Sequence, residues 1–170
     1  TCDTFISMIA VCLHGFLRSG ASMFFLSRSL RPLGYKKILF PTFAYHWSSV
    51  PTIAEKLQRE IHSQLQRNEA SQVDIITYSM GALIFRASLE YDIPYRRALM
   101  IAPPNQGAEM ASQMRRIFPI HKLGWDPFAP LLPECAQQLQ EPSHSIEVGI
   151  LAGIKGDNKG YNRFLSSDND

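Results

Sequence analysis

The chain has 170 residues, of which 19% are charged and 45% hydrophobic, and its formal net charge is +2. This length suits one domain with a single hydrophobic core. The weak charge gives no argument for a nucleic-acid partner or for binding to an anionic membrane surface. The most apolar run, Phe5–Leu13, is too short to span a bilayer and contains Ser7. We therefore expect a globular domain without a transmembrane segment.

The three cysteines, Cys2, Cys12 and Cys135, are odd in number and widely spaced. They predict neither a disulfide framework nor a zinc site. This usage favours a reducing compartment, and we expect the cytoplasm. No basic segment precedes the apolar run, so a signal peptide is not predicted. Because the chain begins with Thr1 and not Met, the question whether a further segment precedes it stays open.

Short, continuous apolar runs alternate with helical patterns along the chain. Such runs are typical of strands that helices cover on both faces. The predicted strands are Phe5–Leu13, Lys37–Phe43, Val73–Thr77, Ala98–Ala102 and Ile146–Ala152. The predicted helices are Ala21–Leu33, Thr52–Arg67, Met80–Tyr91 and Gly107–Ile117. This order favours the α/β class, with a doubly wound, mostly parallel sheet.

Two of the helical patterns allow finer predictions. In the pattern at 52–67 apolar residues recur every four positions, at Ile53, Leu57, Ile61 and Leu65. Thr52 and Glu55 have the spacing of a capping box at its start. In the pattern at 21–33 we expect Phe24, Phe25 and Leu30 to face inward.

Residues 115–145 differ from the rest of the chain. Five prolines argue against one long helix, and Trp125, Phe128 and Leu131 add apolar surface. The segment lies between two predicted strands. It is either an irregular, packed crossover or a lid or cap insertion over a site, since long loops are often functional.

The segment around Ser79 carries the clearest chemical signal. An apolar strand runs into Thr77-Tyr78-Ser79-Met80-Gly81, and a helical pattern follows. This layout is that of a nucleophile elbow, G-x-S-x-G, with Thr77 in the place of the first glycine. Gly81 keeps the second position, where we expect the helix to begin close against the strand that delivers the serine.

A second segment supports this interpretation. An early apolar strand ends in His14-Gly15-Phe16, and serine hydrolases use such a loop to supply one oxyanion donor. Each segment alone is a weak signal. Together, in this order and with a βα unit between them, they are much more specific.

The chain here resembles the α/β-hydrolase superfamily, and within it small bacterial lipase/esterase-like serine hydrolases. The matching segments are Leu13–Ser19, Thr77–Gly81, Ile101–Gly107, Leu151–Gly153 and Ser167–Asp170. The resemblance covers nearly the whole chain and is weakest at 115–145. It implies a single domain over residues 1–170 with a sheet of the α/β-hydrolase type, whose last strand is missing from this fragment.

The resemblance also implies roles for particular residues. Ser79 would be the nucleophile, and the backbone N–H groups of Phe16 and Met80 would form the oxyanion hole. The acid precedes the histidine in this fold. The family's acid-bearing turn favours Asp170, with Asp168 and Asp157 as fallbacks.

The histidine of the triad is then expected beyond Asp170, so that the 170 residues alone would be nearly inactive. The alternative is that His144 is the base and the chain is complete, which needs a non-standard order. His14 precedes the oxyanion loop. We expect it to form hydrogen bonds within that loop and to have no role in the triad.

The implied reaction is the cleavage of a carboxylic ester, lipid-like or acyl, through an acyl-enzyme on Ser79. No cofactor or metal is implied, and the partner would be a small-molecule ester or a lipid. An acyltransferase and a non-catalytic binding module on the same fold are the alternatives. A phosphate-binding loop is disfavoured because Ala21 stands where that motif needs lysine. The oligomeric state stays open.

Overall fold

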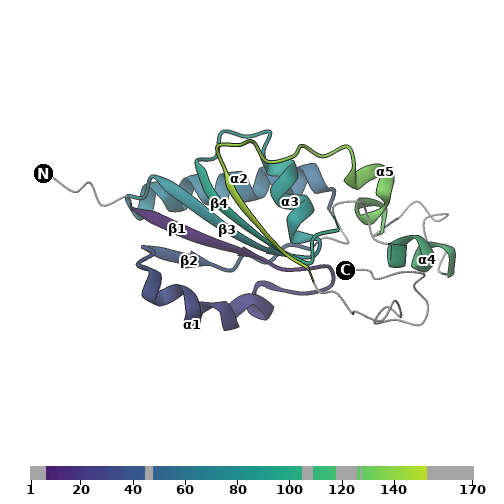
Figure 1. The fold of residues 1–170 in the computed structure, drawn as a ribbon, viewed down its shortest axis with the longest axis horizontal. Coiled ribbons are helices and arrows are strands. Elements are labelled where there is room, and N and C mark those ends of the chain that lie inside the picture. Colours follow the sequence, from purple (N-terminus) through teal and green to yellow (C-terminus); the bar gives the residue numbers. More distant parts are fainter. Residues whose placement is uncertain (1–6, 45–47, 105–108, 118–125, 127, 153–170) are drawn as a thin grey trace, which may run out of the picture.

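The computed structural model describes residues 7–44, 48–104, 109–117, 126 and 128–152. Five strands form one sheet in the order β2-β1-β3-β4-β5, and every neighbouring pair is parallel (Figure 1). They are β1 (Met8–Leu13), β2 (Lys37–Leu39), β3 (Gln72–Tyr78), β4 (Tyr95–Ile101) and β5 (Glu147–Leu151). The predicted α/β class and the doubly wound parallel sheet are confirmed.

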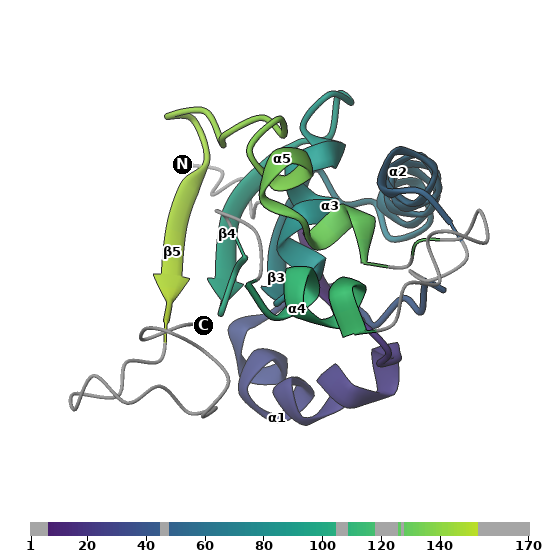
Figure 2. The ribbon, with the colours of Figure 1, turned by 90° about the vertical axis from the view of Figure 1, so that its right-hand side faces the viewer.

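Helical segments cover both faces of the sheet and its carboxyl edge. One face carries α2 (Val50–Arg67) and α3 (Gly81–Ser88), and the other carries η1 (Gly20–Leu26), α1 (Ser27–Leu30) and η2 (Arg31–Leu33). Beyond the carboxyl ends of the strands lie α4 (Glu109–Ile117), η4 (Ala129–Leu131) and α5 (Pro133–Ala136), as Figure 2 shows. Within the described residues, no helix combines the length and apolar character that a membrane crossing requires.

The two central strands, β1 and β3, position the candidate site. Residues Ile9–Leu13 are inaccessible to solvent, because helical segments cover both faces of β1. The parallel register pairs Leu13 with Thr77 at the carboxyl ends of the two strands. The segments that follow these strands therefore begin side by side.

The helix α2 is the amphipathic element that the periodicity predicts, with Ile53, Leu57 and Ile61 buried. Its start differs from the expectation. The N-cap is Ser49, whose hydroxyl oxygen accepts a hydrogen bond from the Thr52 N–H at 3.4 Å. The predicted capping box at Thr52 is wrong, because Thr52 already lies in the first turn.

The single helix predicted at 21–33 is also wrong. The segment consists of a 3₁₀ helix, one short α-helical turn and another 3₁₀ turn, which ends at Gly34 with φ +78°. Met23 and Leu30 are buried, whereas Phe24 and Phe25 are 56% and 69% exposed. The spacing between Met23 and Leu30 places them on the same inner face, so the two phenylalanines point outward.

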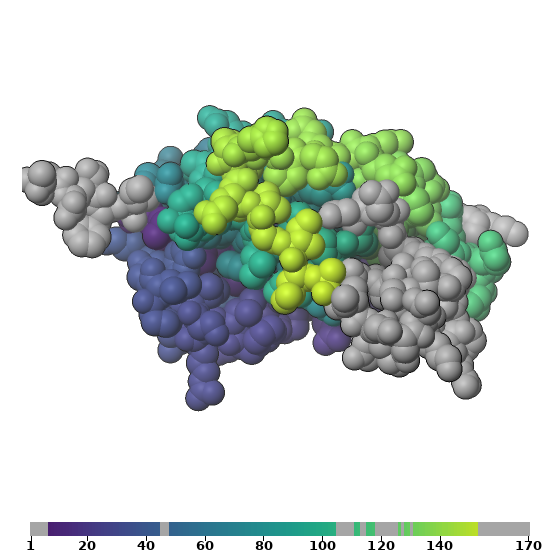
Figure 3. Space-filling model, viewed as in Figure 1, coloured from purple at the N-terminus to yellow at the C-terminus, as the bar shows by residue number. Residues whose placement is uncertain are grey.

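The edge strand β5 is exposed along its whole length, although the sequence predicts a buried strand. It pairs with β4 alone, and Figure 3 shows it at the surface of the molecule. Val148 and Ile150 are 39% and 57% exposed. An apolar run therefore predicts this strand correctly but not its burial.

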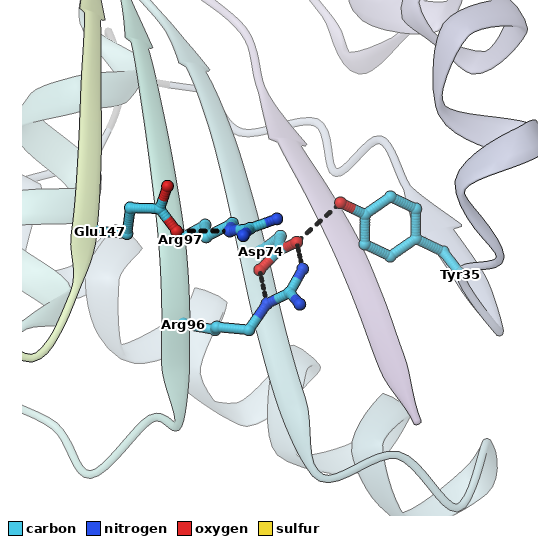
Figure 4. A network of polar contacts seen from close by, with 5 residues as sticks. All are labelled: Tyr35, Asp74, Arg96, Arg97 and Glu147. Carbon is cyan, nitrogen blue, oxygen red and sulfur yellow. Dashed lines mark hydrogen bonds and ion pairs between the residues drawn. The ribbon is translucent and has the colours of Figure 1, made fainter. Parts of the chain in front are cut away.

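A buried carboxylate holds three elements together in the amino half of the sheet (Figure 4). Asp74 in β3 is 3% exposed. The Tyr35 hydroxyl donates to its Oδ2 at 2.7 Å, and Arg96 Nε donates to its Oδ1 at 2.9 Å, with a second contact to Oδ2. Burial and then the bond to Asp74 raise the pKa of Tyr35 to about 12, so the phenol stays protonated. The network joins β3, β4 and the turn before β2.

We expect unequal effects when this network is cut. Arg96→Ala leaves a buried carboxylate without its cation and should lower the free energy of unfolding by about 3–5 kcal/mol. Tyr35→Phe removes one hydrogen bond to a charged group and should cost about 1.5–3 kcal/mol. The matched control is Arg97→Ala, because the Arg97–Glu147 pair is exposed and its loss should cost about 1 kcal/mol or less. Urea unfolding measures all three, and an Arg97→Ala loss equal to that of Arg96→Ala would contradict this account.

Candidate active site

Ser79 lies in the tight turn between β3 and α3. Its φ is +49°, in the left-handed region that residues other than glycine rarely occupy. Such a conformation costs on the order of 1–3 kcal/mol and persists only where its surroundings fix it. Here the Ser79 N–H donates to the Ile101 carbonyl at 2.9 Å, and the Ser79 carbonyl accepts from the Ala82 N–H at 2.9 Å. The turn presents a half-buried serine at the carboxyl edge of the sheet.

The turn requires glycine at position 81, because there is no space for a side chain there. A Cβ at this position would lie 2.8 Å from the Leu13 carbonyl oxygen and 3.0 Å from the His14 carbonyl oxygen. The tight contact is therefore with the end of β1. The helix α3 also contacts β3, the strand that delivers the serine, as the sequence predicts, but the closest approach at Gly81 is to β1. The glycine lets α3 begin directly against the loop that follows β1.

Thr77, which replaces the first glycine of the usual elbow pattern, is fully buried. Its hydroxyl has no hydrogen-bond partner within the described part of the chain. A buried hydroxyl without a partner costs about 1–3 kcal/mol. The fold accommodates the larger residue at this position, but it does so with an unsatisfied polar atom two residues before Ser79.

The loop after β1 lies against the elbow, as the sequence predicts. A Cβ on Gly15 would lie 3.3 Å from the Ser79 Cβ and 3.0 Å from the Tyr78 ring. A glycine here lets the loop approach the serine closely. The two segments that resemble hydrolase motifs, 65 residues apart in the sequence, thus meet in one place.

Two backbone N–H groups beside Ser79 are available as donors. Phe16 follows Gly15 in the loop, and Met80 follows Ser79 in the turn. In the described residues, neither N–H has a hydrogen-bond acceptor. The Met80 side chain is fully buried, and the Phe16 ring packs against the Phe128 ring at a centroid distance of 5.8 Å. These contacts hold the main chain of both residues in place.

His14 is a structural residue of the loop, as expected. The Phe43 N–H donates to its Nε2 at 3.1 Å, so the ring proton is on Nδ1 and donates to the Gly15 carbonyl at 2.8 Å. Burial lowers the pKa of His14 below 6.5, although the bond to Gly15 opposes this shift. The neutral ring is thus the stable form. Its contribution to stability is present above pH 6.5 and is lost as the pH falls, because an imidazolium would direct a proton at the Phe43 N–H.

The remaining acid and base candidates are not brought to Ser79 by the described structure. His144 is exposed and precedes β5, at the amino edge of the sheet. Ser79 follows the carboxyl end of β3, so the length of a strand, roughly 16 Å at about 3.3 Å per residue, separates the two edges. Asp157, Asp168 and Asp170 lie outside the described residues.

Sequence reasoning missed how the segment 115–145 is attached near the site. The side chain of Arg86 in α3 is 1% exposed. It donates to the carbonyls of Leu139 at 2.6 Å and Gln140 at 3.0 Å, and its Nη2 lies 2.9 Å from Glu141 Oε1. The helix behind Ser79 therefore fixes the chain that follows α5. A basic residue within an apolar helix pattern was the only signal in the sequence.

Comparison with solved structures gives the same fold. Phospholipase PlaB from Legionella pneumophila superposes with a TM-score of 0.71 at 19% identity, over 94% of this chain and 42% of that one. The mature form of a lipase from Bacillus licheniformis gives a TM-score of 0.73 at 16% identity, over 89% of this chain and 67% of that one. The chain thus spans less than half of the length of the phospholipase.

The fold is that of the α/β-hydrolases, as the resemblance in the sequence implies. No family model matches the chain. No curated protein matches it by sequence.

The close approach at Gly81 predicts a selective effect of one added methyl group. Gly81→Ala should lower the free energy of unfolding by about 1–3 kcal/mol, because the methyl group meets backbone atoms that cannot move aside. Gly149→Ala is the matched control, since its Cβ would be 3.4 Å from the flexible Leu99 side chain. That variant should stay within about 1 kcal/mol of the parent. Thermal and urea unfolding measure both, and equal tolerance of the two changes would contradict the geometry.

Proposed function

We propose that the protein is a serine hydrolase that cleaves carboxylic esters with lipid-like or acyl groups, with Ser79 as the nucleophile. The observation that carries this proposal is the left-handed Ser79 in its strand-to-helix turn, with the Phe16 and Met80 N–H groups beside it. A strained, non-glycine conformation is expected to persist where function requires it.

In the proposed reaction the Ser79 hydroxyl attacks the ester carbonyl carbon. The negative charge that develops on the carbonyl oxygen accepts hydrogen bonds from the N–H groups of Phe16 and Met80. Loss of one such donor typically costs about 2.7–4 kcal/mol of barrier. The alcohol leaves with a proton, an acyl-enzyme remains, and water releases the acid in a second addition and collapse.

The base and acid of this proposal come from the resemblance. A histidine would take the serine proton, and Asp170 would orient that histidine and stabilise its charged form. His14 is not a candidate for the base, because both of its ring nitrogens are already hydrogen-bonded, one to the Gly15 carbonyl and one to the Phe43 N–H. Cys12 is not a competing nucleophile, because it is buried within β1 and burial raises the pKa of its thiol to about 12.

The preference for a lipid-like ester rests on the surface around the elbow. Leu17, in the proposed oxyanion loop, is 72% exposed, Phe25 is 69% exposed and Tyr78 is 39% exposed. Phe25 and Tyr78 line one cavity, and exposed apolar side chains that share a cavity are typical of a site for an apolar ligand. The two solved structures of similar fold, a phospholipase and a lipase, agree with this preference.

Covalent labelling tests the nucleophile directly. An activated alkyl phosphonate should label the natural full-length protein once, and peptide mass spectrometry should place the adduct on Ser79. Ser79→Ala should abolish labelling and ester turnover, because it removes the hydroxyl oxygen that attacks. The matched control is Ser29→Ala, an exposed serine in α1, which should label like the parent. Labelling that survives in Ser79→Ala would refute the assignment, and a folded parent that neither labels nor cleaves esters would favour a binding module.

A further inference from the structure

A cavity of about 270 Å³ borders the elbow on the side of η1. It is lined by Arg18, Ser22, Met23, Phe25, Tyr78 and Ile101. Tyr78 directly precedes Ser79, and the Ile101 carbonyl accepts the hydrogen bond from the Ser79 N–H at 2.9 Å. The cavity wall is therefore continuous with the backbone that holds the proposed nucleophile.

The wall of the cavity is apolar except at Arg18 and Ser22. Met23 and Ile101 supply hydrocarbon surface, and the rings of Phe25 and Tyr78 add aromatic surface. None of the described residues that line this cavity carries a carboxylate. The Arg18 guanidinium forms no ion pair with any described residue, and its side chain is exposed. An unpaired guanidinium beside an apolar wall suits a ligand that joins an anionic group to a hydrocarbon chain.

The backbone fixes Arg18 relative to the proposed oxyanion hole. The Arg18 N–H donates to the Gly15 carbonyl at 3.3 Å, which closes a turn around Phe16 and Leu17. Leu17 has φ +53° in this turn. Directly after Arg18 in the sequence, a second turn is closed by the Ser22 hydroxyl and N–H, which both donate to the Ser19 carbonyl, at 2.7 and 3.0 Å. Arg18 thus belongs to the same short loop as the Phe16 N–H.

We propose that Arg18 makes the site selective for esters that carry an anionic group, a phosphate or a carboxylate, near the scissile bond. The guanidinium holds the anion at the mouth of the cavity, and the apolar wall holds the adjoining hydrocarbon. The inference rests on the proposed role of Ser79 for its catalytic part, but the binding of an anionic alkyl ligand does not require turnover.

The binding test uses the natural full-length protein with ligands that contain no carboxylic ester, so that nothing is consumed. Calorimetry compares hexyl phosphate, hexanoate and neutral hexanol. The two anions should bind more tightly than hexanol, and Arg18→Gln should weaken the preferred anion about tenfold, as expected for loss of a charge-assisted hydrogen bond. The anion that binds more tightly, hexyl phosphate or hexanoate, shows whether Arg18 prefers a phosphate or a carboxylate. Arg28→Gln is the matched control, because Arg28 is exposed in α1 and does not line the cavity.

The kinetic test uses esters of one acyl chain whose alcohol carries a phosphate, a carboxylate or no charge. Arg18→Gln should lower the ratio of kcat/KM for the anionic ester over the neutral ester about tenfold, mainly through KM, whereas Arg28→Gln should keep the parent's ratio. An unchanged ratio together with unchanged anion binding would overturn the role of Arg18 while leaving Ser79 as the nucleophile. Anion binding that depends on Arg18 in a parent without ester turnover would instead refute the proposed function and keep the anion site.

Discussion

The parallel pairing of β1 with β3 is the contact on which the candidate site depends. Because Leu13 is paired with Thr77, the loop after β1 and the turn after β3 leave the sheet at the same level and side by side. Two glycines then remove the side chains that would keep these segments apart, Gly15 against Ser79 and Gly81 against the end of β1. A shift of one residue in this register would separate the Phe16 N–H from the serine. The buried centre of the sheet therefore sets the geometry of the proposed chemistry.

The Asp74 network and the candidate site lie at opposite edges of the sheet. At the amino edge Asp74 is buried, and its partners Tyr35 and Arg96 satisfy it, which stabilises the fold. At the carboxyl edge the N–H groups of Phe16 and Met80 have no acceptor among the described residues, and Ser79 has a strained conformation. Within the described part of the chain, Ser7 Oγ and Gln72 Oε1 also lack partners at the amino edge, so unsatisfied atoms alone do not distinguish the two edges. Two N–H groups without a described acceptor, beside a serine in a strained conformation, are what favour a ligand site at the carboxyl edge.

The sequence was sufficient for the features that local pattern determines. The apolar runs predicted the parallel strands, and the elbow and the His-Gly loop predicted which segments would meet. It was not sufficient where tertiary contacts decide. Phe24 and Phe25 point outward because the segment forms a 3₁₀ helix against the sheet. The pattern of apolar residues alone does not distinguish this 3₁₀ helix from an α-helix that would turn both rings inward. The exposure of β5 follows from its place at the edge. The candidate acid, Asp170, lies outside the described residues and remains a prediction from resemblance.

The most direct measurement for the central claim is a crystal structure of the natural full-length protein with an alkyl phosphonate bound covalently. The phosphorus should be attached to Ser79 Oγ. One phosphonyl oxygen should accept hydrogen bonds from the Phe16 and Met80 N–H groups, at about 2.7–3.1 Å, because it occupies the position of the oxyanion. An adduct on another residue, or one whose oxygen points away from both N–H groups, would contradict the account.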